Sequence, residues 1–197
     1  MVNEHEKENA AMAAMEYVED GMTIGLGTGS TAKYFVEMLA EEVADGLVVR
    51  CIETSEQTRR LASSLGVPLI PFEQVERIHL TVDGADEVDP QGQLIKGGGA
   101  ALTREKIVAA ASKKFICIAD ESKLVDQLGA FPLPVEVIPM ARSYVARELL
   151  KLGGNPVYRE GVVTDNGNII LDVYDFMIAT PQKTEETING ITGVVTN

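Results

Sequence analysis

Apolar and polar residues alternate along the first two-thirds of the chain with two different periods. Short apolar runs rich in β-branched residues predict strands, and each run is followed by a stretch with the three-to-four-residue spacing of an amphipathic helix. We expect strands at residues 22–27, 47–54, 77–83 and 114–120, and helices at residues 30–44, 55–66 and 100–112. Strands and helices in strict alternation, with strands apolar on both faces, are typical of a parallel sheet covered by helices. The sequence therefore predicts an α/β fold.

The pattern changes after the proline-rich segment at residues 129–139. The expected order there is strand, helix, strand, strand, helix, strand, and Asn166-Gly167 marks a hairpin between the two central strands. This order is typical of a ferredoxin-like unit. We therefore predict a Rossmann-like parallel-sheet catalytic domain at residues 1–128 and a smaller ferredoxin-like α+β domain at residues 129–197, whose last strand is expected to be cut short.

The composition narrows the class of protein. Of the 197 residues, 45% are hydrophobic and 24% are charged, which is typical of a soluble globular protein. The sequence shows no apolar run of about 20 residues and no signal peptide, so we expect a cytoplasmic protein. A net charge of −13 without a cluster of lysine or arginine argues against nucleic acid and against anionic membranes as partners.

The cysteines and histidines do not indicate a metal site. Cys51 and Cys117 both lie in strand-like apolar runs and are expected to be buried thiols. His5 and His79 lack the spacing of metal ligands. We therefore expect no transition-metal site.

Glycine and hydroxyl residues follow the first predicted strand in "GLGTGSTA", residues 25–32. Ser30 stands where the dinucleotide fingerprint has its third glycine, and the Lys-Ser/Thr ending of a P-loop is absent. Thr28, Ser30 and Thr31 at a helix N-terminus nevertheless favour a phosphate cradle. The alternative is a tight turn in which Ser30 only caps the helix. The corresponding loop after the second strand, residues 54–58, is interpreted as an ordinary helix cap.

Acidic residues follow the third predicted strand in "VDGADEVD". Their spacing is not that of an EF-hand loop. Asp83, at the end of the strand, is the candidate functional carboxylate, because such a group can bind the hydroxyls of a polyol. Glu87 and Asp89 are interpreted as parts of a solvated turn.

The stretch "LIKGGGAALTREK" combines an anion site with a nearby negative charge. Lys96 and the glycines at 97–99 suit close binding of an anionic oxygen. Glu105 lies on the helix that follows. It is either a functional carboxylate or a surface residue paired with Arg104 or Lys106.

These loops together resemble the type A ribose-5-phosphate isomerases. "GLGTGSTA", "TVDGADEVD", "KGGGAALTREK" and "FICIADESK" occur in the order and spacing of that family, and "FPLPVEVIPMA" and "GVVTDNGN" extend the resemblance to residues 10–196. It implies an isomerase of the pentose phosphate pathway that interconverts D-ribose 5-phosphate and D-ribulose 5-phosphate without a metal or an organic cofactor. The enediolate intermediate of such a reaction needs one base and preorganised donors for its oxygens.

The resemblance also assigns roles to residues. It implies that Glu105 is the catalytic proton shuttle and that Asp83 assists ring opening and proton movement between the two oxygens. The residues that it implies bind the sugar phosphate are Thr28, Gly29, Ser30, Thr31, Asp83, Gly84, Ala85, Asp86, Lys96, Gly97, Gly98, Gly99 and Lys123. Lys7 lies where some members bring a lysine to the phosphate. The family commonly forms homodimers or homotetramers.

Three alternatives share this architecture. A non-catalytic sugar-phosphate-sensing domain would have no need of Glu105, and the acidic first helix leaves no room for a basic DNA-binding module. An amino-sugar phosphate deaminase would use a histidine for ring opening, and neither histidine lies in a candidate loop. A nucleotide-binding protein is disfavoured by the missing fingerprint glycine.

Overall fold

The computed structural model describes residues 2–197, which form two compact units. The first unit contains the chain up to Gly84 together with Arg104–Ser122, and the second contains Ala85–Thr103 and Lys123–Asn197. Each unit is thus built from two separate segments of the chain. The separation into domains at residues 128 and 129 stays a prediction.

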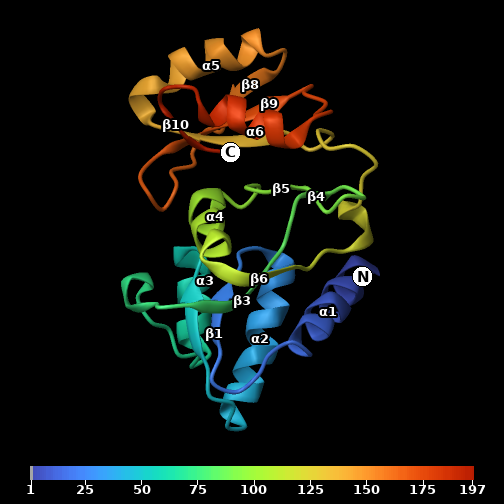
Figure 1. Cartoon of the computed structure of the whole chain (residues 1–197), viewed down its shortest axis with the longest axis vertical. Coiled ribbons are helices and arrows are strands. Elements are labelled where there is room, and N and C mark those ends of the chain that lie inside the picture. Colours follow the sequence, from blue (N-terminus) through green and yellow to red (C-terminus); the bar gives the residue numbers. More distant parts are fainter. Residues whose placement is uncertain (1) are drawn as a thin grey trace. The chain divides into compact units, whose positions relative to one another are not determined.

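The first unit is an α/β sandwich around a parallel sheet (Figure 1). The sheet has four strands in the order β2-β1-β3-β6, and every pairing is parallel. This confirms the α/β prediction. The elements are α1 (Val2–Met15), β1 (Thr23–Leu26), α2 (Ser30–Ala44), β2 (Arg50–Glu53), α3 (Glu56–Ser64), the 3-10 turn η1 (Phe72–Gln74), β3 (Ile78–Asp83), α4 (Leu102–Ala110, which begins in the second unit), β6 (Ser112–Cys117) and the 3-10 turn η2 (Glu121–Lys123).

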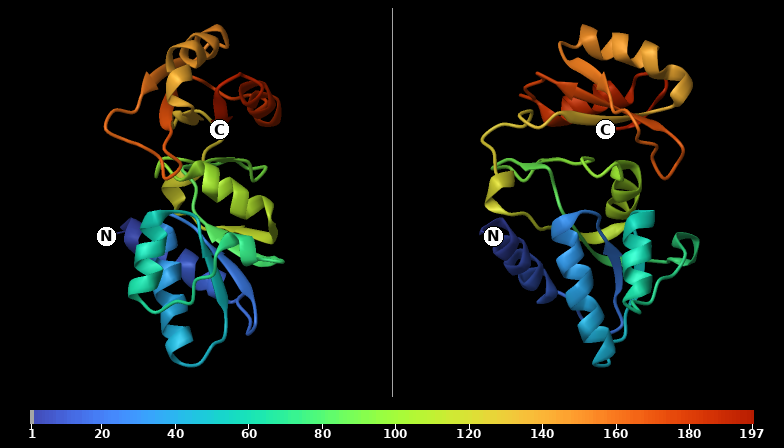
Figure 2. Two further views of the ribbon diagram at one scale, coloured as in Figure 1. Left: turned by 90° about the vertical axis from the view of Figure 1, so that its left-hand side faces the viewer. Right: turned by 180° about the vertical axis from the view of Figure 1, so that it is seen from behind.

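Helices cover both faces of this sheet. Helices α1, α2 and α3 lie on one face and α4 on the other (Figure 2). Phe35 and Leu39 of α2 are buried against β1, and each such side chain contributes about 1.5–3 kcal/mol by leaving water. On the other face, a Cβ at Gly25 would lie 2.6 Å from Cγ1 of Val108. Glycine at 25 therefore lets α4 approach the middle of the sheet closely.

The chain reverses its direction across the sheet at β1. It passes from β1 to β2 on one side and then returns to β3 on the other, so β1 and β3 flank a topological switch point. Ligands of open parallel sheets bind beyond the carboxyl ends of the strands at such a point. The loops that leave β1 and β3 are side by side there, because the Gly27 amide donates to the carbonyl of Val82 at 2.9 Å.

The second unit contains a four-stranded antiparallel sheet with two helices on one face. Its strand order is β10-β7-β9-β8, which is the ferredoxin-like order, and this confirms the predicted type of the smaller α+β part. Its elements are the hairpin β4 (Glu87–Val88) and β5 (Leu94–Ile95), then β7 (Leu133–Val137), the 3-10 turn η3 (Pro139–Ala141), α5 (Arg142–Lys151), β8 (Asn155–Tyr158), β9 (Ile169–Tyr174), α6 (Pro181–Asn189) and β10 (Val194–Thr196). Val135 and Leu171 of the sheet are buried with Val145 and Leu149 of α5.

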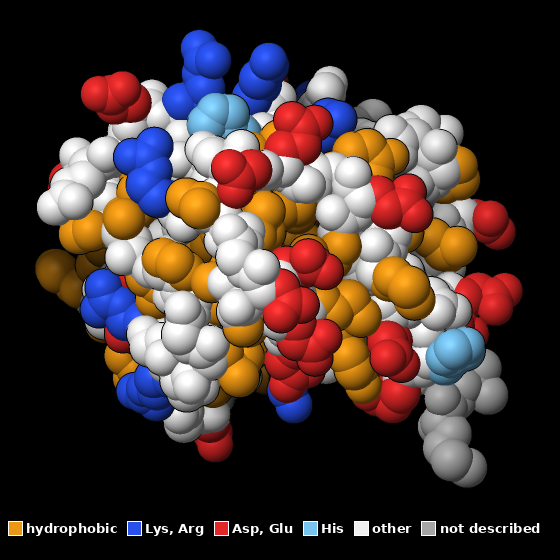
Figure 3. Space-filling view, turned by 90° about the horizontal axis from the view of Figure 1, so that it is seen from below, with side chains coloured by type: hydrophobic (Ala, Val, Ile, Leu, Met, Phe, Trp, Pro, Cys, Tyr) orange, Lys and Arg blue, Asp and Glu red, His pale blue; other side chains and the backbone are white. Residues whose placement is uncertain are grey.

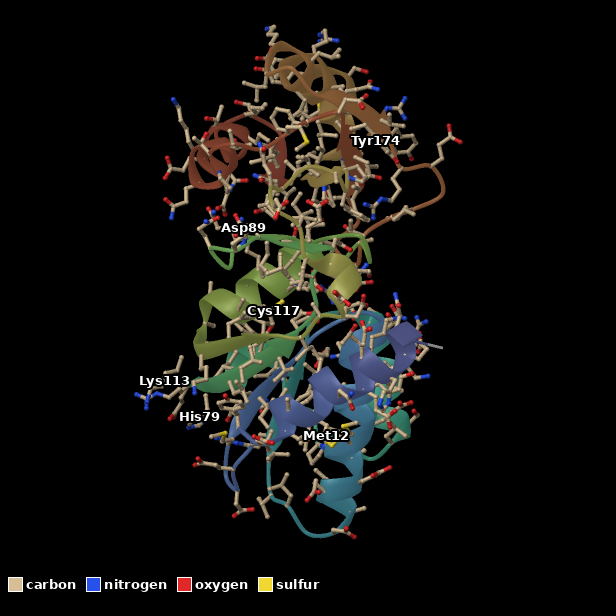
Figure 4. The ribbon with its side chains drawn as sticks, turned by 90° about the vertical axis from the view of Figure 1, so that its right-hand side faces the viewer. Met12, His79, Asp89, Lys113, Cys117 and Tyr174 are labelled. Carbon is tan, nitrogen blue, oxygen red and sulfur yellow. The ribbon has the colours of Figure 1, made fainter. Side chains whose placement is uncertain are left out.

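The acidic loop after β3 differs from its prediction. Glu87 and Asp89 are only 3% and 8% exposed, so their interpretation as solvated residues is wrong. The Glu87 carboxylate accepts from the amides of Gly129 and Phe131, and Asp89 accepts from the amides of Gln91 and Gln93 at the tip of the β4–β5 hairpin (Figure 4). Buried amides need acceptors, and these carboxylates supply them.

The two thiols have different surroundings. Cys51, on the outer strand β2, is fully buried as predicted, and burial raises the pKa of its thiol to about 12. Cys117 is only half-buried, so its predicted burial is wrong. Cys117 is the last residue of the outer strand β6, whereas the outer side of β2 is paired at Cys51 with the segment around Leu69.

The charged side chains are unevenly distributed on the surface. On the face shown in Figure 3, acidic side chains gather near the centre, whereas Lys and Arg lie mainly toward one side. Among the helices of residues 2–197, none combines the length and the apolar character of a membrane span.

Candidate functional site

The loop after β1 presents the N-terminus of α2. Gly29 precedes the helix with a φ of 116°, a conformation that favours glycine, and it brings no side chain to cap the first helical amides. Ser30 and Thr31 are the first two helical residues, so the alternative in which Ser30 is the cap is wrong. Exposed amides at the positive end of a helix dipole suit an anion such as a phosphate.

The side chain of Thr28 belongs to a buried cluster of hydroxyls. Its Oγ1 donates to Oγ of Ser55 at 2.8 Å and lies 2.9 Å from Oγ1 of Thr54 and 3.2 Å from Oγ1 of Thr58. Ser55 in turn caps α3 by accepting from the amide of Thr58 at 3.0 Å, as predicted. The cluster ties the loop after β1 to the loop after β2, so the backbone of Thr28 is fixed from inside the unit.

Asp83 is fully buried at the carboxyl end of β3, with 0% of its surface exposed. Its Oδ1 accepts from the amide of Thr28 at 3.1 Å and from the amide of Gly84 at 2.7 Å. These bonds bring the end of β3 against the loop that follows β1. The sheet thus unites two loops that are 55 residues apart in sequence, as the separation of Thr28 and Asp83 shows.

Glu105 lies in the first turn of α4 and is 5% exposed. The alternative of an exposed surface glutamate is therefore wrong. Its neighbour Arg104 forms an ion pair with Glu56 at 3.2 Å. Because Glu56 begins α3 directly after β2, this ion pair places the first turn of α4 at the carboxyl edge of the sheet. Glu105, Thr28 and Asp83 thus belong to the same edge of the first unit.

The glycine loop lies in the second unit. Gly97 is buried with a φ of 113°, and a Cβ there would lie 2.9 Å from Cβ of Pro134. The amide of Gly98 donates to Oδ2 of Asp86 at 2.8 Å, and a Cβ at Gly98 would lie 2.4 Å from Oδ1 of the same residue. Residue 97 requires glycine, because its φ is positive and Pro134 and Leu102 lie close, whereas a side chain at residue 98 would displace the Asp86 carboxylate.

The remaining predicted residues divide between the two units. The first unit holds Lys7, whose Nζ pairs with Glu4 at 2.9 Å within α1. In the second unit Lys96 directly follows β5, and Lys123 ends η2, and both are half-buried. The predicted substrate-binding residues are Thr28, Gly29, Ser30, Thr31, Asp83 and Gly84 in the first unit, and Ala85, Asp86, Lys96, Gly97, Gly98, Gly99 and Lys123 in the second. The predicted catalytic residues Glu105 and Asp83 are both in the first unit.

Two charged residues that were not predicted from the sequence, Glu136 and Arg159, contact the segment of the glycine loop. Glu136 of β7 is fully buried and accepts from the hydroxyl of Thr103, and Arg159 donates to the carbonyls of Gly97 and Gly98. A signal existed for Glu136, because a charge inside the apolar run "LPVEVI" indicates a buried group with partners. Arg159 in "YREGVV" carries no such signal.

His79 lies away from this edge. Nδ1 of His79 accepts from the amide of Thr23 at the amino end of β1, which is the opposite edge of the sheet (Figure 4). An amino-sugar phosphate deaminase that used a histidine to open the sugar ring would need that histidine at the carboxyl ends of the strands. Within residues 2–197, no three His, Cys, Asp or Glu side chains come together in a way that could hold a metal ion.

Comparison with known proteins agrees with this geometry. Residues 50–197 match the family model described as ribose 5-phosphate isomerase A (phosphoriboisomerase A). The ribose 5-phosphate isomerase A of Neisseria gonorrhoeae is 45% identical with a TM-score of 0.95, over 99% of this chain and 86% of that one. The enzyme of Methanocaldococcus jannaschii is 43% identical with a TM-score of 0.95, over 98% and 89%. A D-ribose-5-phosphate isomerase in complex with phospho-erythronic acid is 42% identical with a TM-score of 0.97, over 100% and 90%.

The three solved structures match both units, including the loops after β1 and β3 and the first turn of α4. The chain therefore belongs to the ribose 5-phosphate isomerase A family, whose members interconvert ribose 5-phosphate and ribulose 5-phosphate.

Proposed function

We propose that Glu105 is the base that moves a proton between C2 and C1 of the open-chain sugar phosphate. The observation that carries this proposal is a glutamate that is 5% exposed in the first turn of α4, at the edge of the sheet where ligands bind. The N-terminus of a helix stabilises a carboxylate in its charged form, which is the form that accepts a proton. Burial also limits the access of water to the proton between its removal and its return.

The proposed reaction consists of two proton transfers at carbon and one between oxygens. The Glu105 carboxylate takes the proton of C2, the C2–H electron pair forms the C1=C2 double bond, and the electrons of the C1 carbonyl move to O1. A proton then passes from O2 to O1. The electrons on O2 form the carbonyl of C2, and C1 takes the proton back from Glu105. Atoms and electrons balance without an oxidant or a reductant.

We assign the phosphate to the N-terminus of α2. The amides of Gly29, Ser30 and Thr31 and the hydroxyl of Ser30 are the donors there, since the hydroxyl of Thr28 is already engaged in the buried cluster. With a net charge of −13, the protein needs such local donors to hold a dianion. A related isomerase binds phospho-erythronic acid, which has a phosphate at one position and a carboxylate at another.

We assign the negative charge of the enediolate to Lys96 and an amide of the glycine loop. The Gly98 amide is engaged by Asp86 at 2.8 Å, so the donors assigned to the enediolate are Lys96 and the amide of Gly99. The planar carboxylate of phospho-erythronic acid resembles an enediolate in shape and charge, and transition-state-like anions bind tightly to preorganised donors. Gly84, Ala85 and Lys123 are assigned to the sugar hydroxyls.

Asp83 has two proposed roles. Its bonds to the amides of Thr28 and Gly84 support a positioning role for the phosphate loop. The role in ring opening and in the transfer between O1 and O2 follows from the family resemblance and is retained as a proposal. Lys7 is a further proposed phosphate contact, although its Nζ pairs with Glu4 within α1.

We also propose a cytoplasmic homodimer or homotetramer. Large apolar side chains on the surface of the second unit, such as Met140 and Met177, support an assembly through that unit. Light scattering after gel filtration would give the mass of the assembly directly. A mass equal to that of one chain would contradict this proposal.

The catalytic proposal is tested by turnover of ribose 5-phosphate together with binding of phospho-erythronic acid. We expect Glu105→Gln to lose about 10²–10⁴-fold in kcat and to bind the acid normally. Glu41→Gln, an exposed change on α2, is the matched control and should behave like the wild type. A wild-type chain that binds the acid but never forms ribulose 5-phosphate would favour the sugar-phosphate-sensing domain instead.

A further inference from the structure

The antiparallel sheet of the second unit has a polar second face. Residues of β7 and β9 alternate, so Val135 and Leu171 face the helices while Pro134, Glu136 and Asp172 face the other way. Glu136 and Asp172 are nevertheless buried. The segment from Gly97 to Thr103 covers this face, because Gly97 packs against Pro134 and Thr103 donates to Glu136.

Arg159 connects the sheet to the glycine loop. It follows β8, and its Nε donates to Oδ2 of Asp172 at 2.7 Å while Nη2 donates to Oδ1 of the same carboxylate. The remaining nitrogen, Nη1, donates to the carbonyl of Gly97 at 3.0 Å and to the carbonyl of Gly98 at 3.2 Å. One planar guanidinium thus contacts a buried carboxylate and two successive peptide groups.

Because the peptide group is planar, a contact that holds its carbonyl also fixes the direction of its N–H group. In a planar trans peptide the C=O and N–H groups point in opposite directions. When Arg159 binds the carbonyls of Gly97 and Gly98, the amides of the same two peptides, those of Gly98 and Gly99, are directed away from it. The Gly98 amide does point to the other side, where it donates to Asp86.

We infer that Arg159 is a positioning residue for catalysis, which fixes the amide of Gly99 as a donor for the anionic enediolate. The inference rests on the proposed role of the glycine loop. Glycine makes such a positioning residue necessary, because three successive glycines have the greatest conformational freedom of any tripeptide and would otherwise present their amides in many directions. Preorganised donors need no reorientation as the charge develops.

Arg159 acts through orientation more than through its own charge. The side chains of Arg159 and Asp172 are 17% and 10% exposed, and the bidentate pair is close to neutral when seen from a distance. The contact therefore requires a planar guanidinium, which binds the Asp172 carboxylate and the carbonyls of Gly97 and Gly98 at the same time. A lysine carries the same charge but offers a single nitrogen.

Four variants test this inference. Arg159→Gln removes the cation and the fork, Arg159→Lys keeps the cation, and Asp172→Asn weakens the support of the fork. Arg142→Gln is the matched control, because Arg142 is an arginine of the same unit whose guanidinium lies over the ring of Tyr158, 4.6 Å from its centroid. The measurements are kcat and KM for ribose 5-phosphate, thermal stability, and Kd for phospho-erythronic acid and for erythritol 4-phosphate, which has the phosphate and lacks the carboxylate.

We expect Arg159→Gln and Arg159→Lys to lower kcat about 10–100-fold, the range for residues that support a catalytic group, with KM within threefold of the wild type. Affinity for phospho-erythronic acid should fall by about the same factor, whereas affinity for erythritol 4-phosphate should stay within about threefold. Asp172→Asn should also lose affinity for phospho-erythronic acid more than for erythritol 4-phosphate, but by a smaller factor. Arg142→Gln should lose affinity for neither ligand. A purely structural role would weaken both ligands equally.

Three results would overturn the inference. The first is normal kcat in folded Arg159→Gln, the second is equal weakening of the two ligands, and the third is failure of both Arg159 variants to fold, which would assign the residue to stability. Glu105→Gln, measured in parallel, separates this inference from the proposed function. If Glu105→Gln stays active, the proton shuttle is wrong, while the selective loss of carboxylate binding in the Arg159 variants still reports on the loop.

Discussion

The carboxylate of Asp83 occupies the space that a side chain at residue 27 would need. A Cβ at Gly27 would lie 2.2 Å from Oδ1 of Asp83 and 2.6 Å from its Cα. The Gly27 amide donates to Val82, and the next amide, that of Thr28, donates to Asp83. The loop after β1 can therefore approach the end of β3 only because residue 27 is a glycine.

Alanine at residue 27 should disturb both the fold and the site. We expect Gly27→Ala to cost about 1–3 kcal/mol in the free energy of unfolding, because the side chain is forced against buried backbone and a buried carboxylate. Activity should fall as well, since Asp83 and the amide of Thr28 must separate. Urea unfolding and turnover are the measurements. Gly190→Ala is the control, because a Cβ there meets its nearest neighbours at 3.4 Å. Equal effects of the two changes would contradict this account.

Removal of the Thr28 hydroxyl should lower stability more than substrate binding. Thr28→Val keeps the shape of the side chain but leaves the hydroxyls of Thr54 and Ser55 with one partner fewer, at a cost of about 1–3 kcal/mol. The phosphate is assigned to the amides of the same loop, so KM should change little, whereas Ser30→Ala should raise it. The measurements are KM from steady-state kinetics and the free energy of unfolding from urea titrations, for both variants. A rise in KM for Thr28→Val without loss of stability would mean that this hydroxyl binds the phosphate.

The sequence was informative where a single local rule decides the outcome. The alternation of strands and helices predicted the parallel sheet, and the serine before α3 was identified as its cap. The prediction of a solvated residue failed for Glu87 because the amides of Gly129 and Phe131 reach it only in the folded chain. It failed for Asp89 because the local turn to Gln91 and Gln93 was not identified. Arg159 was missed for the same reason as Glu87, since its partners lie 13 and about 60 residues away.

The Glu136 network should stabilise the second unit as a carboxylate and not as an amide. Glu136 accepts from Thr103, from Thr164 at 2.8 Å and from Asn168 at 2.9 Å. Glu136→Gln would turn an NH₂ group toward donors, and we expect a loss of about 1–3 kcal/mol in the free energy of unfolding. Glu160→Gln, an exposed change close to Arg159, is the control in the same urea titration. Unchanged stability of Glu136→Gln would show that the network contributes nothing.

The buried thiol of Cys51 should make stability fall at alkaline pH. Its pKa is raised from 9.0 to about 12 in the folded chain, because burial disfavours the thiolate. The folded state therefore keeps a proton that the unfolded state loses, so the contribution is complete below pH 9 and is lost as the pH rises toward 12. Between these limits the wild type should lose about 1.4 kcal/mol more per pH unit than Cys51→Ala. Urea unfolding of both proteins across this range is the measurement, and parallel pH profiles would contradict the prediction.

The most direct test of the central claim follows hydrogen at the reacting carbons by proton NMR of ribose 5-phosphate in D2O. The account predicts that the wild type forms ribulose 5-phosphate and exchanges hydrogen at the migrating position, while Glu105→Gln still binds phospho-erythronic acid and does neither. Continued exchange in Glu105→Gln would show that another group removes the C2 proton and would contradict the account.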